Sequence, residues 1–255
     1  MGLHRAGFRV LGVDVESRGY PFAFRKDDAM TTPLDGYDFI WASPPCQHYS
    51  TATPATHKGN HPDLVAPTRR RLLASDTPYC MENVIGAPLR DVTILCGEMF
   101  NLKVIRHRQF ESSFTLRQPR HKEHKGTVTE GDYWTIVSKG SSGRLYKDRQ
   151  AIGLPGILSS SENAIWMWQK VMEMDWVPNH KGMALAIPPV FAEYIGLCWL
   201  NEKTDGQFDS QIKALFTEDP RRRRERYSIL NLNFRSEHDC HLFYDKWESQ
   251  ALSAE

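Results

Sequence analysis

Short apolar runs bounded by polar residues recur through the first third of the chain. Residues 8–16, 37–43 and 78–84 each have the length and the side chains typical of a β-strand. Between the last two runs, residues 63–75 repeat apolar side chains at the spacing of an amphipathic helix. Strands that alternate with a helix in this way predict an α/β fold with a parallel sheet. Residues 47–62 contain proline and glycine without a regular pattern and predict a long, functional or disordered loop.

The pattern changes after about residue 111. From 112 to 160 basic and small polar residues dominate, with short β-like pieces such as 133–137, which predicts a small irregular insertion. A helical pattern returns at 161–175, and a proline pair then opens a further helix that ends near Leu200.

Past residue 200 the composition changes again. The tail holds a basic run, a strand-like stretch at 230–234 and an amphipathic stretch at 237–250. These shifts divide the chain into a core, an insertion, a return to the core and an extension of unknown role: residues 1–111, 112–160, 161–200 and 201–255.

The composition favours a folded protein. The chain has 255 residues, 40% hydrophobic content and seven tryptophans, which supply a sizeable core and exclude wholesale disorder. The net charge of +1 conceals clusters of basic residues at 69–71, 106–108, 117–125 and 221–224. Each cluster is either a phosphate-binding surface or a solvated face, and for the last one the solvated extension is favoured.

The cysteines give little sign of a metal or of a disulfide framework. They are five in number and form no Cys-x-x-Cys pair. The histidine pairs His57/His61 and His121/His124 lack cysteine partners at ligand spacing, so no metal is expected. Three cysteines in apolar contexts are expected to fill the core: Cys80, Cys96 and Cys198. No apolar run reaches the roughly 18 residues of a membrane span and no signal peptide opens the chain, so reduced thiols in the cytoplasm are expected.

The most informative segment is Pro44-Pro45-Cys46-Gln47, which follows an apolar run. Proline fixes its own φ and biases the preceding residue towards extended backbone, so the thiol is predicted on a rigid turn at the carboxyl end of a strand. Open α/β sheets place ligands at this edge. Glu82-Asn83-Val84 ends the next predicted strand and can reach the same edge. A thiol beside a carboxylic acid suggests covalent catalysis on a ring that needs protonation.

Together with Arg106-His107-Arg108, these two segments resemble motifs of the DNA cytosine-5 methyltransferases, especially the compact phage-type members. The cysteine segment is similar to the nucleophile motif, the glutamate segment to the acid motif, and the arginine pair to the motif that follows. Gly12-Val13-Asp14 resembles the strand whose acid binds ribose. Residues 183–196 resemble the last motif, a helix that returns to the cofactor pocket. The motifs keep the family's order over residues 2–200.

The resemblance implies a fold and a reaction. The fold would be a Rossmann-like sheet that uses S-adenosyl-methionine, with a small target-recognition region at 112–160. The Cys46 thiolate would add to carbon 6 of cytosine while Glu82 holds the ring nitrogen and amino edge. Carbon 5 would then take the methyl group, and proton loss and elimination would free the enzyme. The partner is double-stranded DNA, because the base has to be flipped out of the duplex.

The resemblance also implies the remaining site residues. Arg106 and Arg108, at i and i+2 on an extended segment, are expected to share a face and to clamp the base and its phosphate. The residues expected to bind base and DNA are Pro45, Gln47, Ser50, Asn83 and Val84. Those expected to bind S-adenosyl-methionine are Asp14, Val15, Asp28, Pro44, Ala184 and Ala186. The loop 47–62 would close over DNA.

The chain departs from the family at its N-terminus. A glycine-rich turn should precede the acid of the next strand by about 20 residues, and counting back from Asp14 places that turn before Met1. The strand that carries the turn is normally central in the sheet, so two strand edges are expected to lack a partner. Three explanations stay open: a reading frame that begins upstream, a degenerate chain, or a strand supplied by another segment or chain.

The predicted function is therefore a cytoplasmic DNA (cytosine-5) methyltransferase of a bacterial or phage-infected cell, of the kind found in restriction-modification systems. The insertion is short for a target-recognition region, which predicts a short recognition sequence or modest specificity. The alternative, from another class, is a catalytically silent or cofactor-deficient DNA-binding relative.

Overall fold

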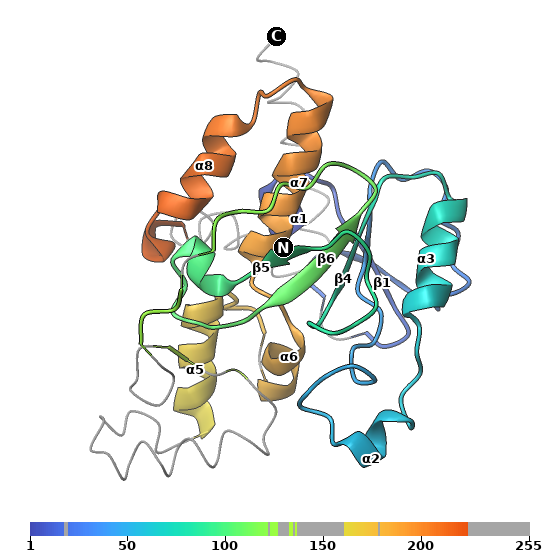
Figure 1. Ribbon diagram of the computed structural model, residues 1–255, viewed down its shortest axis with the longest axis horizontal. Coiled ribbons are helices and arrows are strands. Elements are labelled where there is room, and N and C mark those ends of the chain that lie inside the picture. The colour runs from blue at the N-terminus through green and yellow to red at the C-terminus, as the bar shows by residue number, and fades with distance from the viewer. Residues whose placement is uncertain are drawn as a thin grey trace.

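The computed structural model describes residues 1–17, 20–121, 123–126, 133–134, 136, 161–177 and 179–223. Of the predicted strand at 133–137 the structure describes residues 133, 134 and 136, and Trp134 forms an isolated parallel bridge with Val104. The predicted elements at 230–234 and 237–250 lie wholly outside the described residues. Over the described ranges the chain is a mixed α/β protein whose strands pair in both parallel and antiparallel fashion (Figure 1).

The larger sheet has the strand order β3-β4-β6-β5. Its strands are β3 (Ile40–Ala42), β4 (Tyr79–Asn83), β5 (Thr93–Leu95) and β6 (Arg108–Ser112). β3 and β4 are parallel, and helix α3 (Val65–Ala74) makes the crossover that a parallel pair requires. β6 is antiparallel to both β4 and β5. The prediction of a parallel sheet is thus confirmed for β3 and β4 and wrong for β5 and β6, since no α-helix joins these later strands.

A second, smaller sheet pairs β1 (Leu11–Asp14) with β2 (Ala23–Lys26) in parallel. In the described residues neither strand is hydrogen-bonded to the four-stranded sheet. β1 and β3 therefore each have one neighbour.

Two groups of apolar residues pack on the larger sheet, and β4 contributes to both. Its side chains alternate between the two faces, as they do in any strand. Cys80 joins a core with Phe191 of α7 (Pro189–Lys203), whereas Met81 packs with Val65 and Leu72 of α3. Burial of β4 on both faces makes it the rigid centre of the fold, and every one of its residues is buried.

The remaining helices extend the side of the sheet that α7 covers (Figure 1). They are α1 (Gly2–Arg5), α5 (Ser161–Met172), α6 (His180–Leu185) and α8 (Asp209–Thr217). α1 packs closely on α7, and a Cβ on Gly2 would come within 2.0 Å of the Pro189 carbonyl oxygen. A short 3-10 helix, η1 (Gly97–Phe100), links β5 to the segment before β6.

Most predicted elements are present but begin or end a few residues away. The strand predicted at 8–16 is confined to β1, and the helix predicted at 63–75 is α3. The predicted loop 47–62 contains the short helix α2 (Ala55–Lys58). β2, β5 and α8 are not predicted, because their apolar side chains are too few or too irregularly spaced to stand out from the neighbouring sequence.

One segment, residues 181–203, is apolar and long enough for a membrane span, with a mean hydropathy of 1.5 over its best window. Pro188 and Pro189 interrupt it between α6 and α7. The first half of α7 is buried against the sheet, and Phe191 and Ile195 are fully buried. The apolar character of α7 is therefore that of a core helix.

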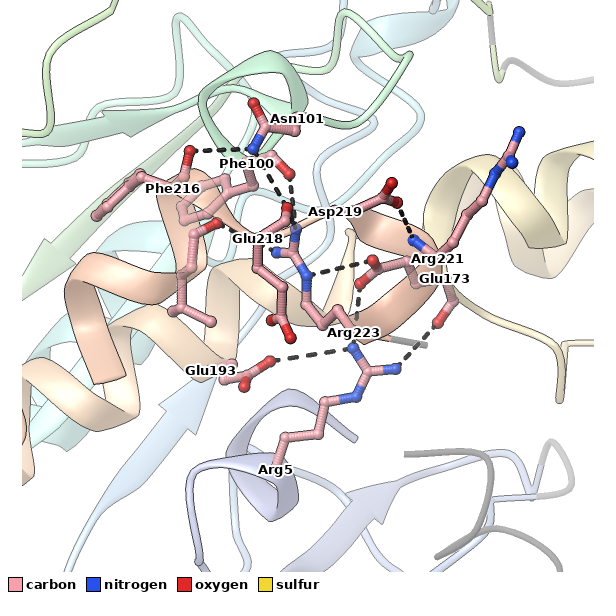
Figure 2. Close-up of polar contacts among 11 residues, drawn as sticks. Arg5, Phe100, Asn101, Glu173, Glu193, Phe216, Glu218, Asp219, Arg221 and Arg223 are labelled. Atoms are coloured by element: carbon pink, nitrogen blue, oxygen red, sulfur yellow. Dashed lines mark hydrogen bonds and ion pairs between the residues drawn. The ribbon is translucent and has the colours of Figure 1, made fainter. Parts of the chain in front are cut away.

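Arg223 overturns the expectation of a solvated basic extension at its position. It is fully buried, and its Nε lies 3.3 Å from Glu173 Oε1 while one terminal nitrogen donates to the Phe100 carbonyl oxygen at 2.8 Å. Arg5 approaches the same Glu173 from α1 at 3.2 Å (Figure 2). Arg221 and Arg222 are exposed, which fits a solvated face and a phosphate-binding surface equally well.

The basic cluster at 69–71 is also partly internal. Arg69 is buried and forms a bidentate pair with Glu111 of β6, with nitrogen–oxygen distances of 2.6 to 3.1 Å. The Tyr79 hydroxyl donates to the same carboxylate at 3.2 Å. This pair holds α3 against the sheet, so Arg69 has a structural role and only Arg70 of this cluster is exposed.

Candidate active site at the carboxyl ends of β3 and β4

Cys46 lies on a turn immediately after β3, as its two preceding prolines predict. The Cys46 carbonyl oxygen accepts hydrogen bonds from the backbone N–H groups of Tyr49 and Ser50, at 3.0 and 2.9 Å. The turn is tied to the neighbouring strand by Asn83, whose Nδ2 donates to the Pro44 carbonyl oxygen at 3.0 Å. The thiol is half-buried and held by its backbone rather than by a helix or strand.

Glu82 is buried at the end of β4, next to the strand that leads to Cys46. Its Oε1 lies 3.0 Å from Nε of Arg108. Burial raises the pKa of Glu82, and the positive charge of Arg108 and the nearby Ser43 side chain limit the rise. A buried carboxyl with a raised pKa exchanges a proton with a ligand more readily than a surface carboxylate.

Arg106 and Arg108 approach the site from the start of β6. Arg106 is buried, and its two terminal nitrogens donate to the carbonyl oxygens of Ile136 and Ala184 at 3.0 and 2.6 Å. Its Nε is buried and has no hydrogen-bond acceptor among the described residues. Burial lowers the pKa of Arg106 to about 9, so the guanidinium is charged at neutral pH. Arg106 thus joins the start of β6 to α6, while its Nε stays available as a donor among the described residues.

Glu82, Arg106 and Arg108 all influence the pKa of the Cys46 thiol. Burial raises the pKa of Cys46, Arg108 and Arg106 lower it, and Glu82 raises it. The Asn83–Pro44 hydrogen bond sets the turn that carries Cys46 beside the end of β4, where Glu82 pairs with Arg108, as expected from the sequence. The predicted residue set Cys46, Glu82, Arg106 and Arg108 is therefore brought together.

The residues expected to bind base and DNA surround this group. Pro45 is exposed, and Gln47 has a buried Oε1 with no hydrogen-bond donor in the described part of the chain. The Ser50 hydroxyl accepts from the Ala52 backbone at 3.1 Å, which keeps it within the turn after Cys46. The Val84 backbone N–H donates to Asn83 Oδ1 at 2.9 Å. All of them lie on the two segments that meet at this edge.

The residues expected to bind a cofactor are divided between two places. Asp14, Val15 and Asp28 lie at the carboxyl ends of β1 and β2, which share one edge because the strands are parallel. Pro44 and Ala184 instead lie beside the candidate site, since the Pro44 carbonyl is bonded to Asn83 and the Ala184 carbonyl to Arg106. Ala186 directly follows α6. In the part of the chain that the structure describes, the strands that lead to the first group are not hydrogen-bonded to the sheet that leads to Cys46.

Ser43 was not assigned a role from the sequence. Its hydroxyl accepts a hydrogen bond from Nε1 of Trp41 at 2.9 Å, and its side chain lowers the pKa of the nearby buried Glu82. A hydroxyl residue directly before the Pro-Pro pair was the available signal, but its partner lies on another strand and is not visible from local sequence.

Comparison with known proteins adds no family. No protein-family model matches the chain, and no curated protein matches it significantly.

Proposed function

We propose that the chain is a DNA (cytosine-5) methyltransferase with the Rossmann-like sheet of enzymes that use S-adenosyl-methionine. The observation that carries the proposal is the convergence of the Cys46 thiol, the Glu82 carboxyl and Arg108 at one strand edge, with Glu82 and Arg108 3.0 Å apart. A nucleophile and a proton donor in one site suit attack on an aromatic ring that has to be activated by protonation.

In this proposal Cys46 adds to carbon 6 of the target cytosine. Glu82, whose pKa is raised by burial, shares a proton with the ring nitrogen and accepts a hydrogen bond from the amino group of the base. Arg108 balances the carboxylate charge, and the free Nε of Arg106 offers a donor to the oxygen of the base. Each of these groups acts on the base without leaving the position that the fold gives it.

The residues at the ends of β1 and β2 fit a nucleoside. One oxygen of Asp14 accepts from the Glu16 backbone at 2.9 Å, and one oxygen of Asp28 accepts from the Met30 backbone at 2.8 Å. The second oxygen of each carboxylate can then accept from ribose hydroxyls and from an adenine amino group. S-adenosyl-methionine, when bound, would supply the methyl group as an electrophile. The carboxylates bind and orient it, and the Cys46 side of the site activates the base.

DNA is the proposed partner, with residues 112–160 as the target-recognition region and the turn after Cys46 as the element that supports a flipped base. The chain would act in the cytoplasm of a bacterial or phage-infected cell, and residues 201–255 would extend the catalytic core.

One observation favours a second candidate, a DNA-binding relative with no methyl transfer. Asp14 and Asp28 lie on a strand pair that is not hydrogen-bonded to the sheet carrying Cys46 in the described residues. A cofactor bound at β1 and β2 would then not be fixed relative to the thiol. The two candidates share the base pocket and differ in whether the methyl group can be delivered.

The deciding experiment is methyl transfer from labelled S-adenosyl-methionine to unmethylated plasmid DNA, combined with trapping on DNA that contains 5-fluorocytosine. A methyltransferase labels the DNA and forms a covalent adduct, and Cys46→Ser abolishes both. Cys198→Ser is the matched control, because Cys198 lies on α7 away from this site, and it should behave as the unaltered chain. DNA binding without label or adduct supports the silent relative, whereas labelling by Cys46→Ser would overturn the nucleophile assignment.

A further inference from the structure

A cysteine and three histidines from separate segments meet beside the candidate active site. Cys96 follows β5, His107 lies between Arg106 and Arg108, and His121 and His124 lie on the segment after β6. No metal was expected from the sequence, because His121 and His124 lack cysteine partners at ligand spacing, and Cys96 is 28 residues away from His124. In the folded chain, however, these residues lie next to one another.

The four side chains have the geometry of a ligand set. One ligand atom from each residue lies within 4.8 Å of every other, and Cys96 Sγ is 4.0 Å from Nε2 of His124. The imidazole centroids are 4.8 to 5.3 Å apart. Tetrahedral zinc, with bonds of about 2.0 Å to nitrogen and 2.3 Å to sulfur, needs donor separations of roughly 3.3 to 3.6 Å. Small side-chain rotations are enough to reach that geometry.

The surroundings hold the ligands in position. Nδ1 of His124 is bonded to the Glu98 carboxylate, which leaves Nε2 directed towards Cys96, and the Tyr133 hydroxyl donates to the same carboxylate. A carboxylate behind a histidine is the usual support for a metal ligand. The Met99 backbone N–H donates to the sulfur of Cys96. Residues other than the four ligands, on η1 and at Tyr133, therefore help to orient His124 and Cys96.

We propose that Cys96, His107, His121 and His124 bind a structural Zn²⁺. One thiolate and three neutral imidazoles suit zinc, and four protein ligands leave no open position for a reacting water. Cys96 is fully buried and His121 is exposed, so the ion lies at the surface end of the core and can be loaded from solvent.

The ion adds a cross-link among three segments that already meet through the β5–β6 pairing and through Gln118, whose side chain bonds to the Ile94 backbone. It fixes the link between β5 and η1 to the start of β6, and it fastens both to the beginning of the region 112–160. Because His107 lies between the two arginines that flank Glu82, zinc also fixes the backbone that presents them. This inference does not require methyl transfer and holds whichever candidate function is correct.

The test is the zinc content of the purified full-length chain by plasma mass spectrometry, followed by replacement with Co²⁺. We expect about one zinc per chain and a cobalt spectrum with tetrahedral d–d bands and a thiolate charge-transfer band. Cys96→Ser should lose the charge-transfer band, and His121→Ala should lower zinc affinity at least tenfold. Removal of zinc by a chelator should lower the melting temperature of the unaltered chain.

Matched controls separate ligation from general damage. Cys198→Ser and His57→Ala replace the same residue types outside the cluster and should keep full zinc content. Cys96 is buried and its variant can fail to fold, but His121 is exposed, so loss of zinc in a folded His121→Ala chain supports ligation. The proposal is overturned if the folded chain takes up no zinc, if it takes up another metal in preference, or if His121→Ala binds zinc as tightly as the unaltered chain.

Discussion

Asn83 Nδ2 donates to the Pro44 carbonyl oxygen at 3.0 Å, and this bond joins the end of β4 to the turn that carries Cys46. Asn83 directly follows Glu82 and is fully buried. The thiol and the carboxyl are therefore not placed independently, because the residue after the acid holds the backbone before the nucleophile. The side-chain amide of Asn83 thus extends the β3–β4 pairing to the turn that carries Cys46.

Asn83→Asp should destabilise the chain and loosen this coupling. The substitution keeps the shape of the side chain but removes the donor and places a carboxylate beside Glu82, so the free energy of unfolding should fall by about 2 to 4 kcal/mol. Urea unfolding measures the change. The exposed Asn60→Asp is the matched control and should stay within about 0.5 kcal/mol of the unaltered chain. Equal stability of the two variants would contradict the structural role of the amide.

Arg108 should control the reactivity of Cys46. Alkylation requires the thiolate, and burial raises the thiol pKa while Arg108 lowers it. Arg108→Met removes the opposing positive charge, so the pKa rises further and the alkylation profile moves to higher pH. Glu82→Gln removes a negative charge and should move the profile the other way. Peptide-resolved mass spectrometry after iodoacetamide treatment from pH 7 to 10 measures both.

An internal reference is available in the same experiment. Burial raises the pKa of Cys198 to about 11 without help from Arg108, so its profile should be unchanged in both variants. If the two substitutions shift Cys46 in the same direction, or shift Cys198 equally, the electrostatic assignment is wrong.

Much of the site could be predicted because its information is local. The apolar run before Pro44 defines β3, and a carboxylate after the next run defines the end of β4, so both groups were expected at one edge. Periodicity identifies faces but not partners, which is why the antiparallel pairing of β6 was missed. Ser43 and Arg223 were not assigned their roles for the same reason, since each depends on a carboxylate brought from a distant part of the chain.

The proposed zinc ligands also could not be predicted from the sequence. A ligand pattern is readable from sequence when the ligands belong to one loop, as in common zinc motifs. Here Cys96 and His107 flank η1, whereas His121 and His124 follow β6, so only the folded chain joins them. The sequence spacing therefore predicted no metal site, whereas the proximity of the four side chains in the fold supports one.

Arg69→Met should destabilise the chain far more than Arg70→Met. Arg69 is buried and pairs with Glu111, which would be left as an uncompensated buried charge, so a loss of about 3 to 5 kcal/mol is expected. Arg70 is exposed on the same helix and should change stability by less than about 0.5 kcal/mol. Urea unfolding distinguishes them, and a small effect at Arg69 would show that the basic cluster is a solvated face after all.

Arg223→Met tests whether the segment after α8 belongs to the folded core. Its guanidinium lies between the Glu173 carboxylate and the Phe100 and Leu215 carbonyl oxygens, and Arg5 shares Glu173 from α1 (Figure 2). Removing the charge leaves Glu173 with one cation and two carbonyl groups without a donor, so about 3 to 5 kcal/mol should be lost.

The neighbouring Arg222 makes the comparison strict, because it is exposed and differs from Arg223 by one position. Arg222→Met should leave the unfolding midpoint unchanged, whereas Arg223→Met should lower it and make the chain easier to cleave by protease near α8. Arg223→Met leaves the buried Glu173 carboxylate with less positive charge around it and with Glu218 nearby. Adding Glu173→Gln removes that buried charge, so the double variant should recover part of the lost stability. Full additivity of the two losses would mean that Arg223 and Glu173 do not interact.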